Sequence, residues 1–187
     1  MSKNLLISAA LVVLLACGLL TAAAPSLWKQ ITDSHHVNDL AQHIANFDLP
    51  AGSEPDYAVE LLGYTVVAYR GTDDYAHLSF LQAPPGVIPN DAALEGYIPD
   101  DRAKTRWNEP TLVRSEQRTI RDQVATLTVS DRTNSEGRRY RSLNLVFQGR
   151  EGTALIVINQ PVSSWDENQI ETFISSIHYE SPHEHAS

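Results

Sequence analysis

The chain contains one cysteine among its 187 residues, which excludes a fold held together by disulfide bonds. Positive charge is also scarce, because 14 lysine and arginine residues face 23 aspartate and glutamate residues and the formal net charge is −9. A nucleic-acid-binding surface needs a basic footprint to neutralise phosphates, so this balance argues against nucleic acid as a partner. It argues equally against broad adhesion to anionic lipid head groups.

The sequence also lacks the usual catalytic signatures. It contains no Gly-x-Ser-x-Gly nucleophile elbow, no phosphate-cradling loop and no dinucleotide fingerprint. The acidic pairs Asp73-Asp74 and Asp100-Asp101 fall in predicted turns or loops, where aspartate is favoured for backbone hydrogen bonding. We therefore predict that the protein is not an enzyme and uses no cofactor. A hydrolase with catalytic residues scattered along the chain is the least favoured alternative.

What the chain does have, at its start, is a long apolar run. Leu5–Ala24 contains twenty residues without a charge, a length that suits a helix crossing the hydrocarbon core of a bilayer. Lys3 and the amino terminus place positive charge before the run, which favours a cytoplasmic N-terminus. We therefore predict a single-pass protein of the bacterial cytoplasmic membrane whose remaining residues lie outside the cytoplasm.

Two other fates of the apolar run also export the domain. Leu14-Leu15-Ala16-Cys17, followed by Gly18, resembles a lipobox and would lead to lipidation at Cys17. Ala22-Ala23-Ala24 offers the small residues that precede cleavage of a secretory signal, although Pro25 disfavours that bond. An anchor, a lipoprotein and a secreted protein therefore remain open.

The rest of the chain alternates between two hydrophobic periodicities. Apolar residues at intervals of three and four predict a helix over Val37–Phe47 and a second over Ile170–Ile177, the latter after a capping box of Ser164 and Glu167. A brief helix is expected after Asn90. Segments rich in β-branched and aromatic residues predict strands, and short turns between the later ones favour antiparallel hairpins. The predicted strands are 57–62, 64–69, 76–82, 111–120, 123–130, 140–148 and 154–160.

These elements divide the chain into four parts. We predict an N-terminal anchor or signal at 1–24, a juxtamembrane linker at 25–34, a single extracytoplasmic domain at 35–179 and a disordered tail at 180–187. The order of elements predicts an α+β fold in which helices flank a mostly antiparallel sheet.

Several local motifs occur in a recognisable order. They are Phe47-Asp48-Leu49-Pro50-Ala51-Gly52, hairpin turns at Glu136-Gly137 and Glu151-Gly152, and Pro161–Ile177 with the helix start Trp165-Asp166-Glu167. Over about residues 47–179 they resemble the PsbP-like superfamily of α/β/α sandwiches, which includes extrinsic proteins of photosystem II, a Ran-binding nuclear factor and bacterial envelope lipoproteins. No catalytic residue set defines that group, so the resemblance implies a binding or scaffold role.

One histidine pattern has the spacing of a metal site. His36, Asp39 and His43 fall on one side of the first predicted helix, where two imidazoles and a carboxylate can share a metal. The same spacing suits the solvated edge of an amphipathic helix, which is the favoured interpretation. We therefore predict no metal site and keep these three residues as the candidates.

The one dense basic cluster in this acidic chain consists of Arg138, Arg139 and Arg141, with Arg150 nearby in the sequence. It is either a solvated hairpin face or a docking patch for an acidic protein partner. With the predicted anchor, it favours a non-catalytic extracytoplasmic accessory or interaction subunit of a membrane or envelope complex.

The alternative function is that of an envelope lipoprotein, lipidated at Cys17, that binds a small ligand or a metal. Its binding site would be a cleft between sheet and helix, lined by aromatic residues such as Tyr57, Tyr64 and Trp107.

Overall fold

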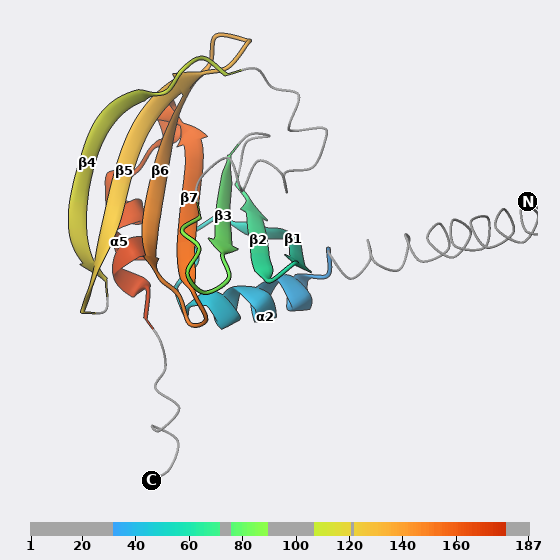
Figure 1. The fold of residues 1–187 in the computed structure, drawn as a ribbon. Coiled ribbons are helices and arrows are strands. Elements are labelled where there is room, and N and C mark those ends of the chain that lie inside the picture. The colour runs from blue at the N-terminus through green and yellow to red at the C-terminus, as the bar shows by residue number, and fades with distance from the viewer. Residues whose placement is uncertain (1–31, 72–75, 90–106, 121, 179–187) are drawn as a thin grey trace, which may run out of the picture.

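The computed structural model describes residues 32–71, 76–89, 107–120 and 122–178. In this part of the chain one seven-stranded antiparallel sheet carries two α-helices (Figure 1). The strands are β1 (Glu54–Leu61), β2 (Tyr64–Arg70), β3 (His77–Gln82), β4 (Thr111–Ile120), β5 (Gln123–Thr133), β6 (Arg139–Gln148) and β7 (Thr153–Pro161). The helical elements are α2 (Ser34–Ile44), the short 3-10 turn η1 (Val162–Ser164) and α5 (Glu167–Ser176).

The sheet joins two groups of neighbouring strands in the order β1-β2-β3-β7-β6-β5-β4. Within each group, strands that follow one another in the sequence pair antiparallel. The groups meet where β3 pairs with β7, with Phe80 opposite Ile156. The chain therefore passes from β3 to the far edge at β4 and returns strand by strand to the middle of the sheet.

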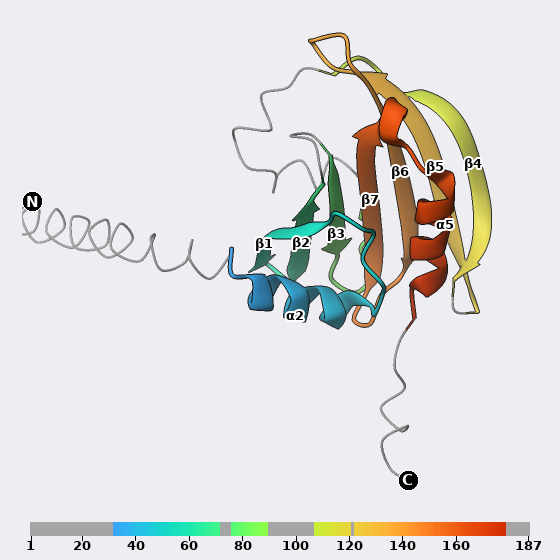
Figure 2. The same ribbon diagram turned by 180° about the vertical axis from the view of Figure 1, so that it is seen from behind.

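Both described helices pack on the same face of this sheet, as Figure 2 shows. Each is amphipathic and begins at an aspartate whose carboxylate accepts backbone N–H groups: Asp33 caps α2 and Asp166 caps α5. Their apolar sides bury Val37, Leu40, Ala41 and Ile44 of α2 and Ile170, Phe173 and Ile174 of α5. These residues pack against alternate residues of the strands and form the main core.

Aromatic rings occupy the centre of this core. Phe47, which follows α2, stacks on Phe80 of β3 with ring centroids 4.4 Å apart, and both rings meet Phe173 of α5 edge to face. Tyr69 of β2 packs beside them and donates its hydroxyl to Asn38 of α2 at 3.1 Å. Burial raises the pKa of Tyr69 to about 12, so this hydroxyl remains a donor at any ordinary pH.

The segments that follow the two helices are also tied to each other. Asn46 and His178 exchange two backbone hydrogen bonds of 2.9 Å, and the backbone N–H of Asp48 donates to the hydroxyl of Ser176 at 2.9 Å. The two ends of the domain are therefore joined directly, although more than a hundred residues separate them in the sequence.

The predicted fold class, an α/β/α sandwich preceded by a transmembrane helix, is wrong in its arrangement of layers. The structure has a seven-stranded antiparallel sheet, and both helices in the described ranges lie on one of its faces. None of these helices is both long and apolar enough to cross a bilayer. Helical periodicity shows which side of a helix is apolar but not which face of a sheet it covers, which is why the layer order was mispredicted. The apolar run Leu5–Ala24, Cys17 and the helix expected after Asn90 lie outside the described residues.

The seven predicted strands are confirmed to within three residues at each end. The predicted capping box is wrong, because Ser164 donates its hydroxyl to the carbonyl oxygen of Pro161 and lies in η1. Asp166 caps α5 instead, while Glu167 accepts a hydrogen bond from the indole of Trp165 at 2.7 Å. The helix begins after Asp166, two residues beyond Ser164, because an aspartate is as effective an N-cap as a serine.

Candidate functional site

The turn between β5 and β6 has a backbone fixed by one buried side chain. The side-chain oxygen of Asn134 accepts hydrogen bonds from the backbone N–H groups of Glu136 at 3.0 Å and Arg138 at 2.9 Å. Gly137 supplies the positive φ of 80° that the turn requires. The residues that follow are therefore presented in a defined position at the tip of the hairpin.

Two arginines of the predicted patch lie exposed at this tip. The side chain of Arg138 is 61% exposed and lies 3.4 Å from Glu136, and that of Arg139 is 65% exposed and lies 3.2 Å from Asp131. Ion pairs this exposed contribute little to stability. Both side chains therefore present most of their surface to solvent at the tip of the hairpin.

Arg141 is held differently, although it is two residues away. Its side chain is 24% exposed and donates two hydrogen bonds to Asp131, at 2.7 and 3.0 Å. The guanidinium carbon also lies 5.7 Å from the centroid of the Trp165 ring. Arg141 therefore joins β6 to β5 and to the segment that leads into α5, and its side chain is less exposed than those of Arg138 and Arg139.

Arg150 does not belong to the same surface. It follows β6, whereas Arg139 begins this strand of ten residues, so about 30 Å of strand separates the two residues. The side chain of Arg150 donates to Asn46 at 3.0 Å, and its backbone N–H donates to the carbonyl oxygen of Ile44. The structure thus brings three of the four predicted arginines to one end of the sheet and places the fourth at the other.

The tip of the hairpin packs against an aromatic residue. Trp107 forms a backbone bridge with Asn134 and meets Tyr140 edge to face, with ring centroids 5.2 Å apart. The guanidinium of Arg132 lies 4.8 Å from the centroid of the Trp107 ring. We call Trp107, Arg132, Asn134, Arg138 and Arg139 the hairpin end. The sequence pattern gives no signal for Arg132, because its partner Trp107 lies 25 residues earlier and on no adjoining predicted element.

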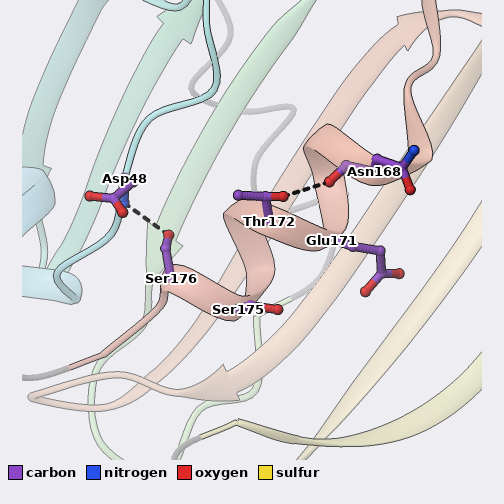
Figure 3. A pocket seen from close by; sticks show the side chains of 6 residues that line it. All are labelled: Asp48, Asn168, Glu171, Thr172, Ser175 and Ser176. Carbon is purple, nitrogen blue, oxygen red and sulfur yellow. Dashed lines mark hydrogen bonds between the residues drawn. The ribbon is translucent and has the colours of Figure 1, made fainter.

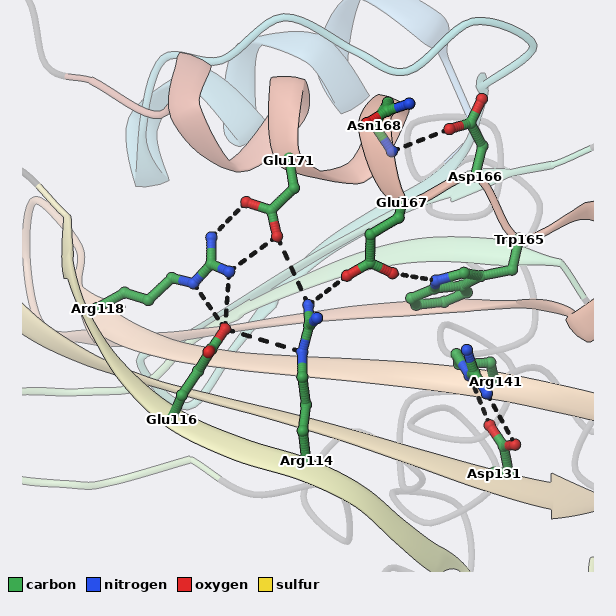
Figure 4. A network of polar contacts seen from close by, with 10 residues as sticks. All are labelled: Arg114, Glu116, Arg118, Asp131, Arg141, Trp165, Asp166, Glu167, Asn168 and Glu171. Atoms are coloured by element: carbon green, nitrogen blue, oxygen red, sulfur yellow. Dashed lines mark hydrogen bonds and ion pairs between the residues drawn. The ribbon is translucent and has the colours of Figure 1, made fainter.

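A second charged cluster holds α5 against β4, as Figure 4 shows. Arg114 and Arg118 of β4 reach Glu167 and Glu171 of α5, with 2.5 Å between Arg114 and Glu167 and 2.8 Å between Arg118 and Glu171. Glu116 of β4 accepts a hydrogen bond from Arg118 at 2.8 Å. We call these five residues the Arg–Glu clamp. The hydrogen bonds from Arg118 to Glu171 raise the pKa of Arg118. The hydrogen bonds that Glu167 accepts from the Trp165 indole and from Arg114 lower the pKa of Glu167.

The pairing of Asp131 with Arg141 predicts a dependence of stability on pH. The hydrogen bonds from Arg141 lower the pKa of Asp131 in the folded state. Its stabilising effect is therefore present above the unfolded value of about 3.9 and is lost as pH falls through the folded pKa. We expect Asp131→Asn to be less stable than the native chain near neutral pH, and the difference to shrink below about pH 4. Urea unfolding of both proteins across this pH range measures the difference in their stability. A difference that stays constant with pH would contradict the stabilising pair of Asp131 and Arg141.

The helix face also carries an open pocket of about 550 Å³, shown in Figure 3. It is lined by Asp48, Asn168, Glu171, Thr172, Ser175 and Ser176. The hydroxyl groups of Thr172 and Ser176 donate to carbonyl oxygens within α5, at 2.8 and 2.7 Å. Neither hydroxyl is paired with a general base there, and no histidine lines the pocket. We interpret it as a shallow surface depression.

The predicted metal candidates lie along the exposed side of α2. His36, Asp39 and His43 are all solvent-exposed, and Nδ1 of His43 hydrogen-bonds the backbone carbonyl oxygen of Asp39 at 2.7 Å. Within the ranges that the structure describes, no three histidine, cysteine, aspartate or glutamate side chains are grouped so as to hold a metal ion.

The aromatic residues predicted to line a ligand cleft are not brought together. Tyr57 and Tyr64 belong to a smaller apolar cluster with Val66 and Leu81, on the sheet face opposite the helices. Trp107 lies instead at the hairpin end. The described residues therefore form no cleft between sheet and helix from these three side chains.

The hairpin end thus exposes Arg138 and Arg139, whereas the Arg–Glu clamp pairs its arginines with carboxylates of its own chain. Compared with known protein families and with curated proteins, the chain has no match.

Proposed function

We propose that this domain is a non-catalytic, extracytoplasmic accessory subunit that docks an acidic surface of a protein partner in a bacterial membrane or envelope complex. One observation carries the proposal: Arg138 and Arg139 are each more than 60% exposed on a turn held by Asn134. A turn that is already ordered loses little conformational entropy on binding, which favours affinity.

The chemistry of these side chains favours a carboxylate-rich partner. Arginine is enriched at protein interfaces and binds carboxylates in a bidentate manner. Here both side chains are more than 60% exposed, so a carboxylate of a partner can approach them from solvent. The chain as a whole carries a charge of −9, so an acidic partner is attracted locally, at the hairpin end, and repelled elsewhere.

Two features of the sequence support the location and the class of function. The apolar segment Leu5–Ala24 favours export and association with a membrane, where the raised effective concentration lets modest contacts suffice for assembly. The sequence has no nucleophile elbow, phosphate-cradling loop or dinucleotide fingerprint, and this favours binding over catalysis.

The test is a double charge reversal of the hairpin end, Arg138→Glu with Arg139→Glu. We expect recovery of the partner from detergent-solubilised membranes to fall at least about fivefold, because two attractive contacts become repulsive. Arg141 stays unchanged, since its reversal would break the pair with Asp131 and disturb the fold.

Arg70→Glu is the matched control. Arg70 is 55% exposed and lies 3.4 Å from Glu54, an ion pair like that of Arg138, but it belongs to β2. We expect this variant to recover the partner as the native chain does, with circular dichroism confirming that all proteins are folded. Equal recovery by the hairpin variant, or equal loss by both variants, would remove the hairpin end as the docking surface.

A further inference from the structure

The outer edge of β4 presents a regular strand that nothing in the described part of the chain pairs with. A bulge lies between Leu112 and Arg114, but pairing with β5 is regular from Arg114 to Ile120. Such an edge offers backbone donors and acceptors to another strand. The opposite edge strand, β1, contains Pro55 and a bulge beside it, both of which weaken edge pairing.

The alternation of the antiparallel ladder identifies the outward backbone groups. Residues of an antiparallel strand direct their N–H and C=O groups alternately to one neighbour and to the other side. Ile120 pairs with Gln123 across a two-residue turn, and such a turn closes on a hydrogen-bonded pair. Counting back from Ile120, the groups of Ser115, Gln117 and Thr119 point to the outer edge.

The charged side chains of β4 do not cover this edge. Charged residues often protect edge strands by projecting past them. Here Arg114, Glu116 and Arg118 are only 34%, 38% and 28% exposed, because the Arg–Glu clamp holds them on the helix face. The outward backbone groups are therefore accessible.

We propose that β4 pairs antiparallel with β4 of a second copy of this chain, about a twofold axis at Gln117, so that the two sheets become continuous. In this register Glu116 lies opposite Arg118 of the second copy, and the reverse pair occurs on the other side of the axis. Opposite charges placed directly across an antiparallel pair are favourable. Ser115 meets Thr119 on the other face, and Gln117 meets its own copy.

The neighbouring registers are excluded by charge and by the bulge. An axis at Glu116 would place this glutamate opposite its copy and Arg114 opposite Arg118, which sets like charges against each other. An axis at Ser115 would pair Gln117 with Val113, at the bulge where the regular ladder ends. The axis at Gln117 uses the whole regular segment and places opposite charges together.

The strength of such an association is limited by its size. Three hydrogen-bonded residue pairs supply about six backbone hydrogen bonds across the axis. An interface of this size belongs with the smaller, weaker protein contacts, so we expect a reversible dimer whose population rises with concentration. The hairpin end takes no part in it.

Charge substitutions at the axis test the proposal with the full-length chain in detergent. Gln117 is exposed, so Gln117→Lys and Gln117→Glu leave the core intact, but each opposes a like charge across the axis. We expect either variant to weaken self-association by about fivefold in sedimentation equilibrium, and an equimolar mixture of the two to recover it. Ser115→Lys is the control, since it opposes the neutral Thr119 and should associate like the native chain.

A site-specific cross-link provides the second measurement. Gln117→Cys should be joined by a short bismaleimide more efficiently than the native chain, whose single cysteine, Cys17, is present in both proteins. A native chain that stays monomeric at its highest soluble concentration would overturn the proposal. So would equal weakening by the variants at 117 and 115, or a mixture that fails to recover association.

Discussion

Replacing Phe80 with alanine is expected to lower the free energy of unfolding by about 4 kcal/mol. Phe80 is 0% exposed, and its ring stacks on Phe47 at 4.4 Å and meets Tyr69 and Phe173 edge to face. It therefore joins β3 to the segment after α2 and to α5. The loss combines the transfer of a large apolar side chain with the cavity left behind, because a close-packed core relaxes only in part.

Urea unfolding at neutral pH measures this change, with Val124→Ala as the matched control. Val124 lies in the same sheet but is 70% exposed, so its truncation should change stability by no more than about 0.5 kcal/mol. A loss below about 1.5 kcal/mol for Phe80→Ala would show that the aromatic centre does not hold the two helices as described.

Gly152→Ala is expected to destabilise the protein by about 3 kcal/mol through a steric clash between backbone segments. A Cβ atom at Gly152 would lie 2.2 Å from the carbonyl oxygen of Ala83, which belongs to the backbone and cannot rotate away. Hydrogen bonds hold both segments in place, since Gly149 donates to Gly152 at 2.8 Å and Ala83 donates to Thr153 at 3.0 Å. Relief of the clash would separate the end of β3 from the β6–β7 turn.

Gly86→Ala separates this clash from the general cost of replacing glycine. Gly86 has a φ of 82°, but an added Cβ would meet nothing within 4 Å, so we expect a loss of about 1 kcal/mol. Thermal and urea unfolding should therefore rank Gly152→Ala as the more damaging variant. Equal losses would contradict the close approach at Ala83.

Only part of the candidate site could be predicted from the sequence. Arg138 and Arg139 were identified because they stand beside a turn in an acidic chain. The commitment of Arg141 to Asp131 depends on a cross-strand register, and the contact of Arg118 with Glu171 joins residues 53 positions apart. Such contacts arise when distant elements are brought together, and residue type and spacing do not encode them.

The three predicted metal candidates on α2 show the same limit in reverse. His36, Asp39 and His43 lie within α2 and on its exposed side, as the amphipathic pattern indicated. Helical spacing placed them near one another, but a metal site needs ligands converging from other elements. No described neighbour of α2 completes such a set.

Local sequence determined the boundaries of the strands, the hairpins between successive strands and the apolar sides of both helices, because periodicity and turn chemistry act over a few residues. Three features required the folded chain: the pairing of β3 with β7, the packing of both helices on one face, and the separation of Arg150 from the hairpin end. Each depends on which distant apolar surfaces bury one another most completely, and that competition is settled only when the whole core packs.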